Sequence, residues 1–490
     1  MRHILITVLV ALAVVLAGCA SDGGSGNGAS VGGNGNGNGA SGGGGQNVGV
    51  SAGGAQDANV FRTNIEEGYV PQPTDVVPEG LYHDYYFDTN LGSDCAARFC
   101  AAYDRAVSED PLSGEREQFM AVGLNSGITQ AELQREKLNL IVVLDVSGSM
   151  DSPFAQYYYD GDERREVESD QRKIEAATDA VSTLTDKLGA DDRFALVTYE
   201  DSARVEESMR RMDERNRDAL RERIDAIETR GGTNLAAGMD KAASIAESYP
   251  GEGENRSTRI VYVTDAMPNI GDTSTGGLGG QIQPQAQRDI HTTFVGVGVD
   301  FNTRLTNALA DVRGANYYSV HSPSAFESRM DEGFTYMTTP LAHDLSLTVA
   351  GDGYEVENVY GAPGEAGDGE LLSVSTLFPS RSEGDAGEGS VILVEFDREG
   401  DAADREVQLT ASYETPNGEV HERTKTVTFA DQSAPYYEST GVRKAVVLTR
   451  YASLMQNWAA HERAMAAGED ADVPDGVESR ERNQWEQTSL

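Results

Sequence analysis

The sequence predicts an α/β protein whose main domain is a doubly wound, mostly parallel sheet, followed by a β-sandwich and a C-terminal helix. Between residues 137 and 340, continuous apolar runs alternate with amphipathic helical patterns, which is typical of a parallel sheet covered by helices. From 341 to 432, short runs with alternating apolar residues follow one another at even spacing, as in a sandwich. The chain of 490 residues is also longer than one domain usually is.

The N-terminus reads as an export signal. Met1-Arg2-His3 is a short basic start, and residues 4–17 are almost wholly apolar but too few to span a bilayer comfortably. Leu16-Ala17-Gly18-Cys19 is similar to a prokaryotic lipobox, in which the matching Cys becomes lipidated; the alternative is an ordinary secretory signal. We therefore expect residues 1–19 to be a lipoprotein signal peptide. The protein would lie outside the cytoplasm, at the cell surface or in the periplasm, and contact the membrane only through lipid on Cys19.

A linker and an N-terminal segment are expected next. Residues 20–59 are mostly Gly, Ser and Asn, so they lack the apolar surface that offsets chain entropy and should be disordered. In the segment 60–136, residues 118–124 read as a strand that pairs into the sandwich. Cys95 and Cys100, in an exported chain, favour a short-loop disulfide. The alternative, a zinc site that uses both together with His83, lacks a recognisable fourth ligand.

The elements of the main domain, residues 137–340, follow from the period of their apolar residues. Apolar runs predict buried strands at 138–144, 193–199, 259–264, 292–299 and 316–320. Spacings of three and four residues predict helices at 174–188, 213–229, 235–248, 301–312 and from 324 onward.

Oxygen donors follow two of these strands. Asp145-Val146-Ser147-Gly148-Ser149 comes directly after one apolar run, and Asp265 ends another. Gly231-Gly232-Thr233-Asn234 lies in a loop before a helical pattern. Because ligands of such sheets bind outside the carboxyl ends of the strands, we expect these groups to converge there. Carboxylate and hydroxyl oxygens suit Mg²⁺, Ca²⁺ or Mn²⁺ rather than Zn²⁺.

In this order, the three motifs resemble the metal-ion-dependent adhesion site of von Willebrand factor type A domains, and the resemblance covers residues 137–340. It implies a divalent cation held directly or through water by five residues, which we call the five predicted ligands: Asp145, Ser147, Ser149, Thr233 and Asp265. It also implies that an acidic side chain of a partner completes the shell. Mg²⁺ is the expected ion, and Ca²⁺ or Mn²⁺ would also suit. The family commonly has Gly after the last Asp, whereas this chain has Ala266, a change that removes no ligand.

Beyond Pro340 the pattern changes to short strands. They are predicted at 343–350, 354–360, 371–377, 390–396, 406–413 and 420–429, with Asn417-Gly418 as a hairpin turn before the last. We assign 341–432 to the sandwich. Residues 433–466 should form the C-terminal helix, packed on the sandwich or, alternatively, used by a partner helix. The acidic tail 467–490 should be disordered.

Charge restricts the partners. Eighty acidic and 39 basic residues give a formal charge of −41, which argues against binding nucleic acid or anionic lipid. The composition resembles that of proteins from salt-loving prokaryotes; an acidic surface protein from a genome of high GC content is the alternative. No zinc-protease motif, phosphate-binding loop or nucleophile elbow in a structural context is present, so we expect no enzymatic activity.

These observations predict recognition of a protein with an exposed Asp or Glu through a bound cation, as in adhesion. Neighbouring loops should give specificity, above all the insertion 152–170 with Tyr157, Tyr158 and Tyr159, whose alternative role is packing against the sandwich. The whole layout is similar to that of prokaryotic proteins labelled calcium-activated chloride channel homologues. Because no other segment forms a pore, the second hypothesis is an accessory subunit that regulates a membrane channel or complex.

Overall fold

The fold is seen in a computed structural model. It describes residues 47–467 except for the following: 53–60, 63–64, 66–69, 90–94, 96, 112, 155–156, 160–162, 166–170, 250, 252–255, 266–277, 299–308, 310–311, 321, 351–353, 362–369, 384–385, 399–405 and 429–431. The predicted lipidation site Cys19, most of the linker and the acidic tail after 467 lie outside the described residues.

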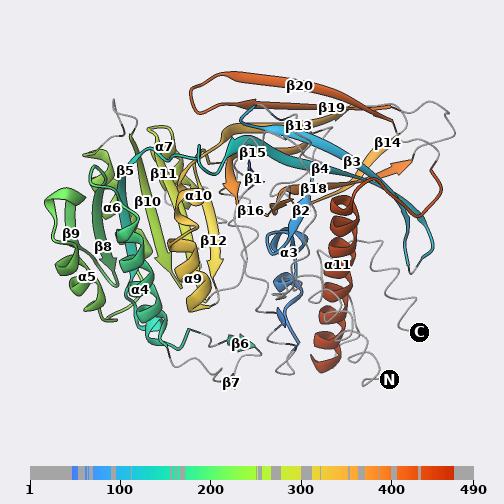
Figure 1. Cartoon of the computed structure of the whole chain (residues 1–490). Helices are drawn as coiled ribbons and strands as arrows, with labels where there is room; N and C mark the ends of the chain where they lie inside the picture. The colour runs from blue at the N-terminus through green and yellow to red at the C-terminus, as the bar shows by residue number, and fades with distance from the viewer. Residues whose placement is uncertain are drawn as a thin grey trace, which may run out of the picture. The chain divides into compact units, whose positions relative to one another are not determined.

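The main domain, which we call the head, is a six-stranded sheet with helices on both faces (Figure 1). Its strand order is β12-β11-β10-β5-β8-β9, parallel throughout except for the pair formed by β8 and the edge strand β9. The strands are β5 (Lys137–Asp145), β8 (Arg193–Tyr199), β9 (Ala203–Arg211), β10 (Arg256–Thr264), β11 (Ile290–Val297) and β12 (Asn316–Val320). The helices are α4 (Lys173–Asp186), α5 (Arg217–Asp225), α6 (Leu235–Glu247), α7 (Leu278–Ala286), α9 (Pro323–Met330) and α10 (Phe334–Thr338). The predicted doubly wound sheet is thus confirmed.

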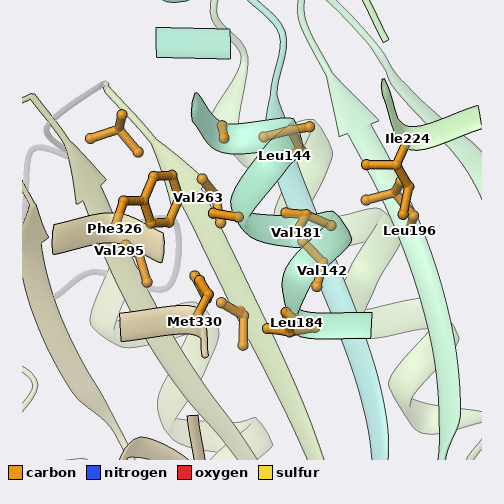
Figure 2. Packing of buried hydrophobic residues seen from close by; sticks show 14 of the residues in the cluster. Val142, Leu144, Val181, Leu184, Leu196, Ile224, Val263, Val295, Phe326 and Met330 are labelled. Carbon is orange, nitrogen blue, oxygen red and sulfur yellow. The ribbon is translucent and has the colours of Figure 1, made fainter. Parts of the chain in front are cut away.

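Side chains of the central strand β5 point alternately to the two faces of the sheet, and both faces are buried. Val142 and Leu144 pack under α4, α5 and α9, whereas Ile141 and Val143 pack under α6 and α7. Figure 2 shows the first of these cores, with Val181 of α4 above β5. A strand buried on both faces needs a continuous apolar run, and this requirement explains why β5 was recognisable from sequence.

The second domain, which we call the sandwich, contains ten strands. They are β1 (Asn47–Ala52), β3 (Cys100–Glu109), β4 (Arg116–Thr129), β13 (Ala342–Ala350), β14 (Tyr354–Tyr360), β15 (Glu370–Ser380), β18 (Val391–Arg398), β19 (Glu406–Glu414), β20 (Val420–Thr428) and β21 (Tyr436–Tyr437). A sandwich usually has two separate sheets. Here the long strand β4 pairs with β18, β3 and β1 and joins the strands into one continuous hydrogen-bonded sheet. The C-terminal helix is α11 (Thr440–Ala467), which packs against this domain through Val442 and Leu448.

The predicted linker boundary at residue 59 is wrong. Residues 47–52 form β1, which lies between β4 and β15 in the sheet, and the side chains of Val48 and Val50 are buried in the core of the sandwich. The two valines are two positions apart, so both side chains point to the same face of the strand and into the core. The residues on either side of this strand are rich in glycine.

The remaining described elements are short. They are the helical segments η1 (Pro73–Asp75), α3 (Pro78–Tyr82), η2 (Gly148–Asp151) and η3 (Met212–Glu214), and the strands β2 (Tyr86–Asp88), β6 (Tyr157–Tyr159), β7 (Glu163–Arg165), β16 (Ser382–Glu383) and β17 (Ala386–Glu388). None of the helices in the described part of the chain combines the length and the apolar content that crossing a bilayer requires.

Candidate metal centre

The first predicted ligand, Asp145, is the last residue of β5 and is fully buried. Its Oδ1 accepts a hydrogen bond from the Ser147 backbone N at 2.9 Å, which folds the chain back toward the carboxylate. Its Oδ2 accepts from the Tyr199 hydroxyl and from the Thr264 hydroxyl, each at 2.7 Å. A buried charge requires such partners, and together they fix the orientation of the carboxylate.

Tyr199 and Thr264 come from the strands on either side of β5. They end β8 and β10, and the Tyr199 hydroxyl also lies 2.9 Å from the Thr264 hydroxyl. The pKa of the Tyr199 phenol is raised well above its usual value, mainly by burial and secondly by the negative charge of Asp145. The phenol therefore stays protonated and acts as a donor. Neither residue was predicted from sequence, because each reads as part of an ordinary core strand.

Three of the predicted ligands form a chain of hydrogen bonds. The Ser147 hydroxyl lies 3.1 Å from the Ser149 hydroxyl, and the Ser149 hydroxyl donates to Asp265 Oδ1 at 2.7 Å. Asp265 follows β10, whose parallel register pairs Val263 with Leu144, so both aspartates lie at the same edge of the sheet. Ser147 is buried and Ser149 is exposed, which makes this edge reachable from solvent.

Thr233 is brought to the same edge by backbone contacts of its loop. The Gly231 carbonyl accepts a hydrogen bond from the backbone N of Gly148 at 3.2 Å. Gly148 stands between the two serines in the sequence. Gly231 has φ +68°, and a Cβ there would overlap the Glu200 carboxylate, so the loop requires glycine at this position. Thr233 itself is exposed. Among the described residues, no hydrogen bond links its hydroxyl to the other four predicted ligands.

Lys173 also belongs to this site, although it was not predicted from sequence. Its Nζ donates to Asp265 Oδ2 at 3.0 Å, and only 7% of the Lys173 side chain and 2% of the Asp265 side chain are exposed. Lys173 is the first residue of α4, where its backbone N donates to the Ser152 carbonyl at 3.0 Å. Its position at the start of an amphipathic helix was visible in the sequence, but its contact with Asp265 was not.

The chemistry of these donors fits a hard divalent cation. Asp145, Asp265 and the two serines offer only oxygen donors, and hydrogen bonds join the Ser147 hydroxyl to the Ser149 hydroxyl and the Ser149 hydroxyl to Asp265. Within the described ranges, no group of three or more His, Cys, Asp or Glu side chains is arranged to hold a metal. A cation at this edge would therefore depend on hydroxyl ligands as well as on carboxylates.

Other predicted sites stand as follows. Cys95 and Cys100 are joined in a disulfide, which removes both thiols from the alternative zinc site. The predicted contact residues Tyr157, Tyr158 and Tyr159 form β6, which pairs with β7, and their side chains lie outside what the structure describes. Ala266 also lies outside it.

Comparisons with known proteins found likenesses to parts of this chain. Residues 140–267 match the family model of the von Willebrand factor type A domain. An uncharacterized protein of Synechocystis sp. is 26% identical over 191 residues, which cover 39% of each chain. The human inter-alpha-trypsin inhibitor heavy chain H2 is 21% identical over 214 residues, 43% of this chain and 20% of that one. The match thus spans well under half of either relative. A solved von Willebrand factor type A structure from Catenulispora acidiphila is 17% identical, covers 78% of this chain and 84% of its own, and superposes with a TM-score of 0.46.

Proposed function

We propose that the protein binds a divalent cation and uses it to recognise an acidic residue of a protein partner, because residues 140–267 match the family model of the von Willebrand factor type A domain. Asp145, Ser147, Ser149, Thr233 and Asp265 would hold the ion, directly or through water. When bound, the ion supplies an electrophilic centre for a partner carboxylate. Mg²⁺ is the expected ion, with Ca²⁺ and Mn²⁺ as alternatives.

The observation that carries this proposal is the convergence of a fully buried aspartate, two hydroxyls and a second aspartate at one solvent-accessible sheet edge. Three hydrogen bonds hold Asp145 in place before any ion arrives, so little ordering is left for binding to accomplish. On a chain of formal charge −41, a partner carboxylate is repelled unless a cation lies between, which would make recognition dependent on metal.

We also propose that the protein binds rather than catalyses, and that it acts outside the cytoplasm on a lipid anchor at Cys19. The Cys95–Cys100 disulfide supports export, because disulfides form and persist in oxidising compartments. Metabolic labelling with a fatty acid tests the anchor: Cys19→Ser should abolish the label, and a labelled variant would rule the anchor out.

The metal proposal is tested by calorimetric titration of the full chain with Mg²⁺ and Mn²⁺. Ser149→Ala removes an exposed hydroxyl ligand and should abolish binding without unfolding the head. The control, Ser208→Ala, removes an exposed hydroxyl on the edge strand β9 and should bind like the unaltered protein. No binding by the unaltered protein, or equal binding by Ser149→Ala, would reject the proposal.

A crosslinking pull-down in Mg²⁺ and in chelator then separates the two functional hypotheses. Capture of an extracellular or cell-to-cell ligand that requires both Mg²⁺ and Ser149 supports adhesion. Co-purification with an integral protein of the same membrane, with the same requirements, supports the accessory-subunit hypothesis.

A further inference from the structure

Lys173 is an unusual residue for its surroundings. The chain has only six lysines, all within the described residues, and Lys173 alone among them is buried. Burying an ammonium group is costly unless a charge and hydrogen bonds compensate it. The compensating charge is Asp265, one of the five predicted ligands, whose Oδ2 accepts from the Lys173 Nζ at 3.0 Å.

The fold holds Lys173 in this position from two sides. The segments that flank the insertion after Ser152 are joined by a bridge between Pro153 and Arg172, which fixes the start of α4 beside the loop of the two serines. On the other side lies Gly298, which follows β11 and has φ +61°. A Cβ at Gly298 would lie 3.0 Å from the Lys173 Cε, so glycine leaves room for the lysine stem.

The two carboxylate oxygens of Asp265 accept hydrogen bonds from different donors. Oδ2 accepts from Lys173, and Oδ1 accepts from the exposed Ser149 hydroxyl, on the side where the other predicted ligands lie. The ammonium therefore orients Oδ1 toward the candidate metal position. It also changes the charge of the site: two aspartates and one lysine leave a single formal negative charge, and a divalent cation then makes the site positive by one.

We propose that Lys173 is a built-in cation of the metal centre, a positioning residue that weakens divalent binding and keeps the loaded site positive toward an acidic ligand. This inference rests on the proposed function and deepens it. A site with two uncompensated aspartates would hold the ion more tightly but would be neutral once loaded. With Lys173 in place, a partner carboxylate meets a net positive charge, which favours its binding on an otherwise acidic protein.

The test is calorimetric titration of the full chain with Mn²⁺ alone. Lys173→Gln removes the charge but can still donate to Asp265, and it should bind Mn²⁺ about tenfold more tightly, because one nearby unit charge at short range is worth at least that much. Lys173→Arg keeps the charge and should bind like the unaltered protein. The matched control is Lys137→Gln, which makes the same charge change at the opposite end of β5, where Lys137 pairs with Asp191 at 3.5 Å.

Thermal unfolding gives a second readout that does not depend on the partner. In chelator, Lys173→Gln should melt below the unaltered protein because Asp265 loses its ion pair, and Mn²⁺ should raise its melting temperature by a larger margin. If Lys173→Gln folds only with Mn²⁺ bound, chelator is titrated into the Mn²⁺-loaded variant and into the Mn²⁺-loaded unaltered protein, and the variant should release its ion only at a higher chelator concentration.

The outcomes separate this inference from the proposed function. Equal or weaker Mn²⁺ binding by Lys173→Gln, beside binding by the unaltered protein, overturns the role of Lys173 and leaves the metal proposal standing. Binding by Lys173→Gln alone rejects metal use by the unaltered protein and, with it, the role of Lys173 in a loaded site. Binding by neither overturns both.

Discussion

The Tyr199 hydroxyl is expected to contribute measurably to the stability of the head. It is fully buried and donates to the buried Asp145 carboxylate at 2.7 Å. Tyr199→Phe removes this donor, and within the described part of the chain Asp145 Oδ2 then accepts only from the Thr264 hydroxyl. A hydrogen bond to a charged group contributes about 1.5–3 kcal/mol, so the free energy of unfolding should fall by that amount.

Tyr262 offers a matched control on the neighbouring strand β10. It is equally buried, but its hydroxyl has no hydrogen-bond partner among the described residues. Tyr262→Phe should therefore leave the free energy of unfolding unchanged or raise it, since an unsatisfied buried hydroxyl is lost. Both variants are measured by urea unfolding followed by circular dichroism at one fixed salt concentration. Equal effects of the two substitutions would refute the idea that Asp145 depends on Tyr199.

Two further predictions concern the stability of the fold. Burial lowers the pKa of His291 to about 3 and that of His343 to about 4. As the pH falls below about 6.5, these histidines become protonated in the unfolded chain but stay neutral in the folded protein. Each histidine should therefore lower the free energy of unfolding by about 1.3 kcal/mol between pH 7.5 and 5.5. Urea unfolding at the two pH values checks this, and the His291→Asn and His343→Asn variants should show a smaller loss; an unchanged loss contradicts it. In the core, Leu144→Ala should cost about 2–5 kcal/mol, whereas Leu454→Ala on α11 should change stability by less than about 0.5 kcal/mol. Leu144 is fully buried and Leu454 is 43% exposed, so similar losses in thermal melts would show that burial does not govern the cost.

The parts of the fold that were predictable from sequence are those that local pattern determines. Strands β5 and β10 are buried on both faces and read as continuous apolar runs, and the motifs at their ends place Asp145 and Asp265 at one sheet edge. The edge strand β9 gave no such signal, because only Glu207 and Met209 of its nine residues are buried. The strand β1 was hidden by the glycine-rich composition that surrounds it.

In the candidate site, the five predicted ligands come from three short motifs, which contain Asp145 with the two serines, Thr233 and Asp265, and their role in holding a metal stays a prediction. The residues that orient them were not predictable from sequence. Tyr199 and Thr264 have the types expected in a buried strand, and only tertiary packing brings their hydroxyls to Asp145. Lys173 lies 28 positions after Asp145 and reaches Asp265 because the base of the insertion closes beside it.

Anomalous diffraction from crystals of the protein grown with Mn²⁺ shows whether these oxygens surround a divalent ion. We predict one manganese peak at the carboxyl edge of the head sheet, bounded by Ser147, Ser149, Thr233 and Asp265, with Asp145 behind it. A well-ordered head with no peak there, or with manganese bound only elsewhere, would mean that these residues do not form a metal site.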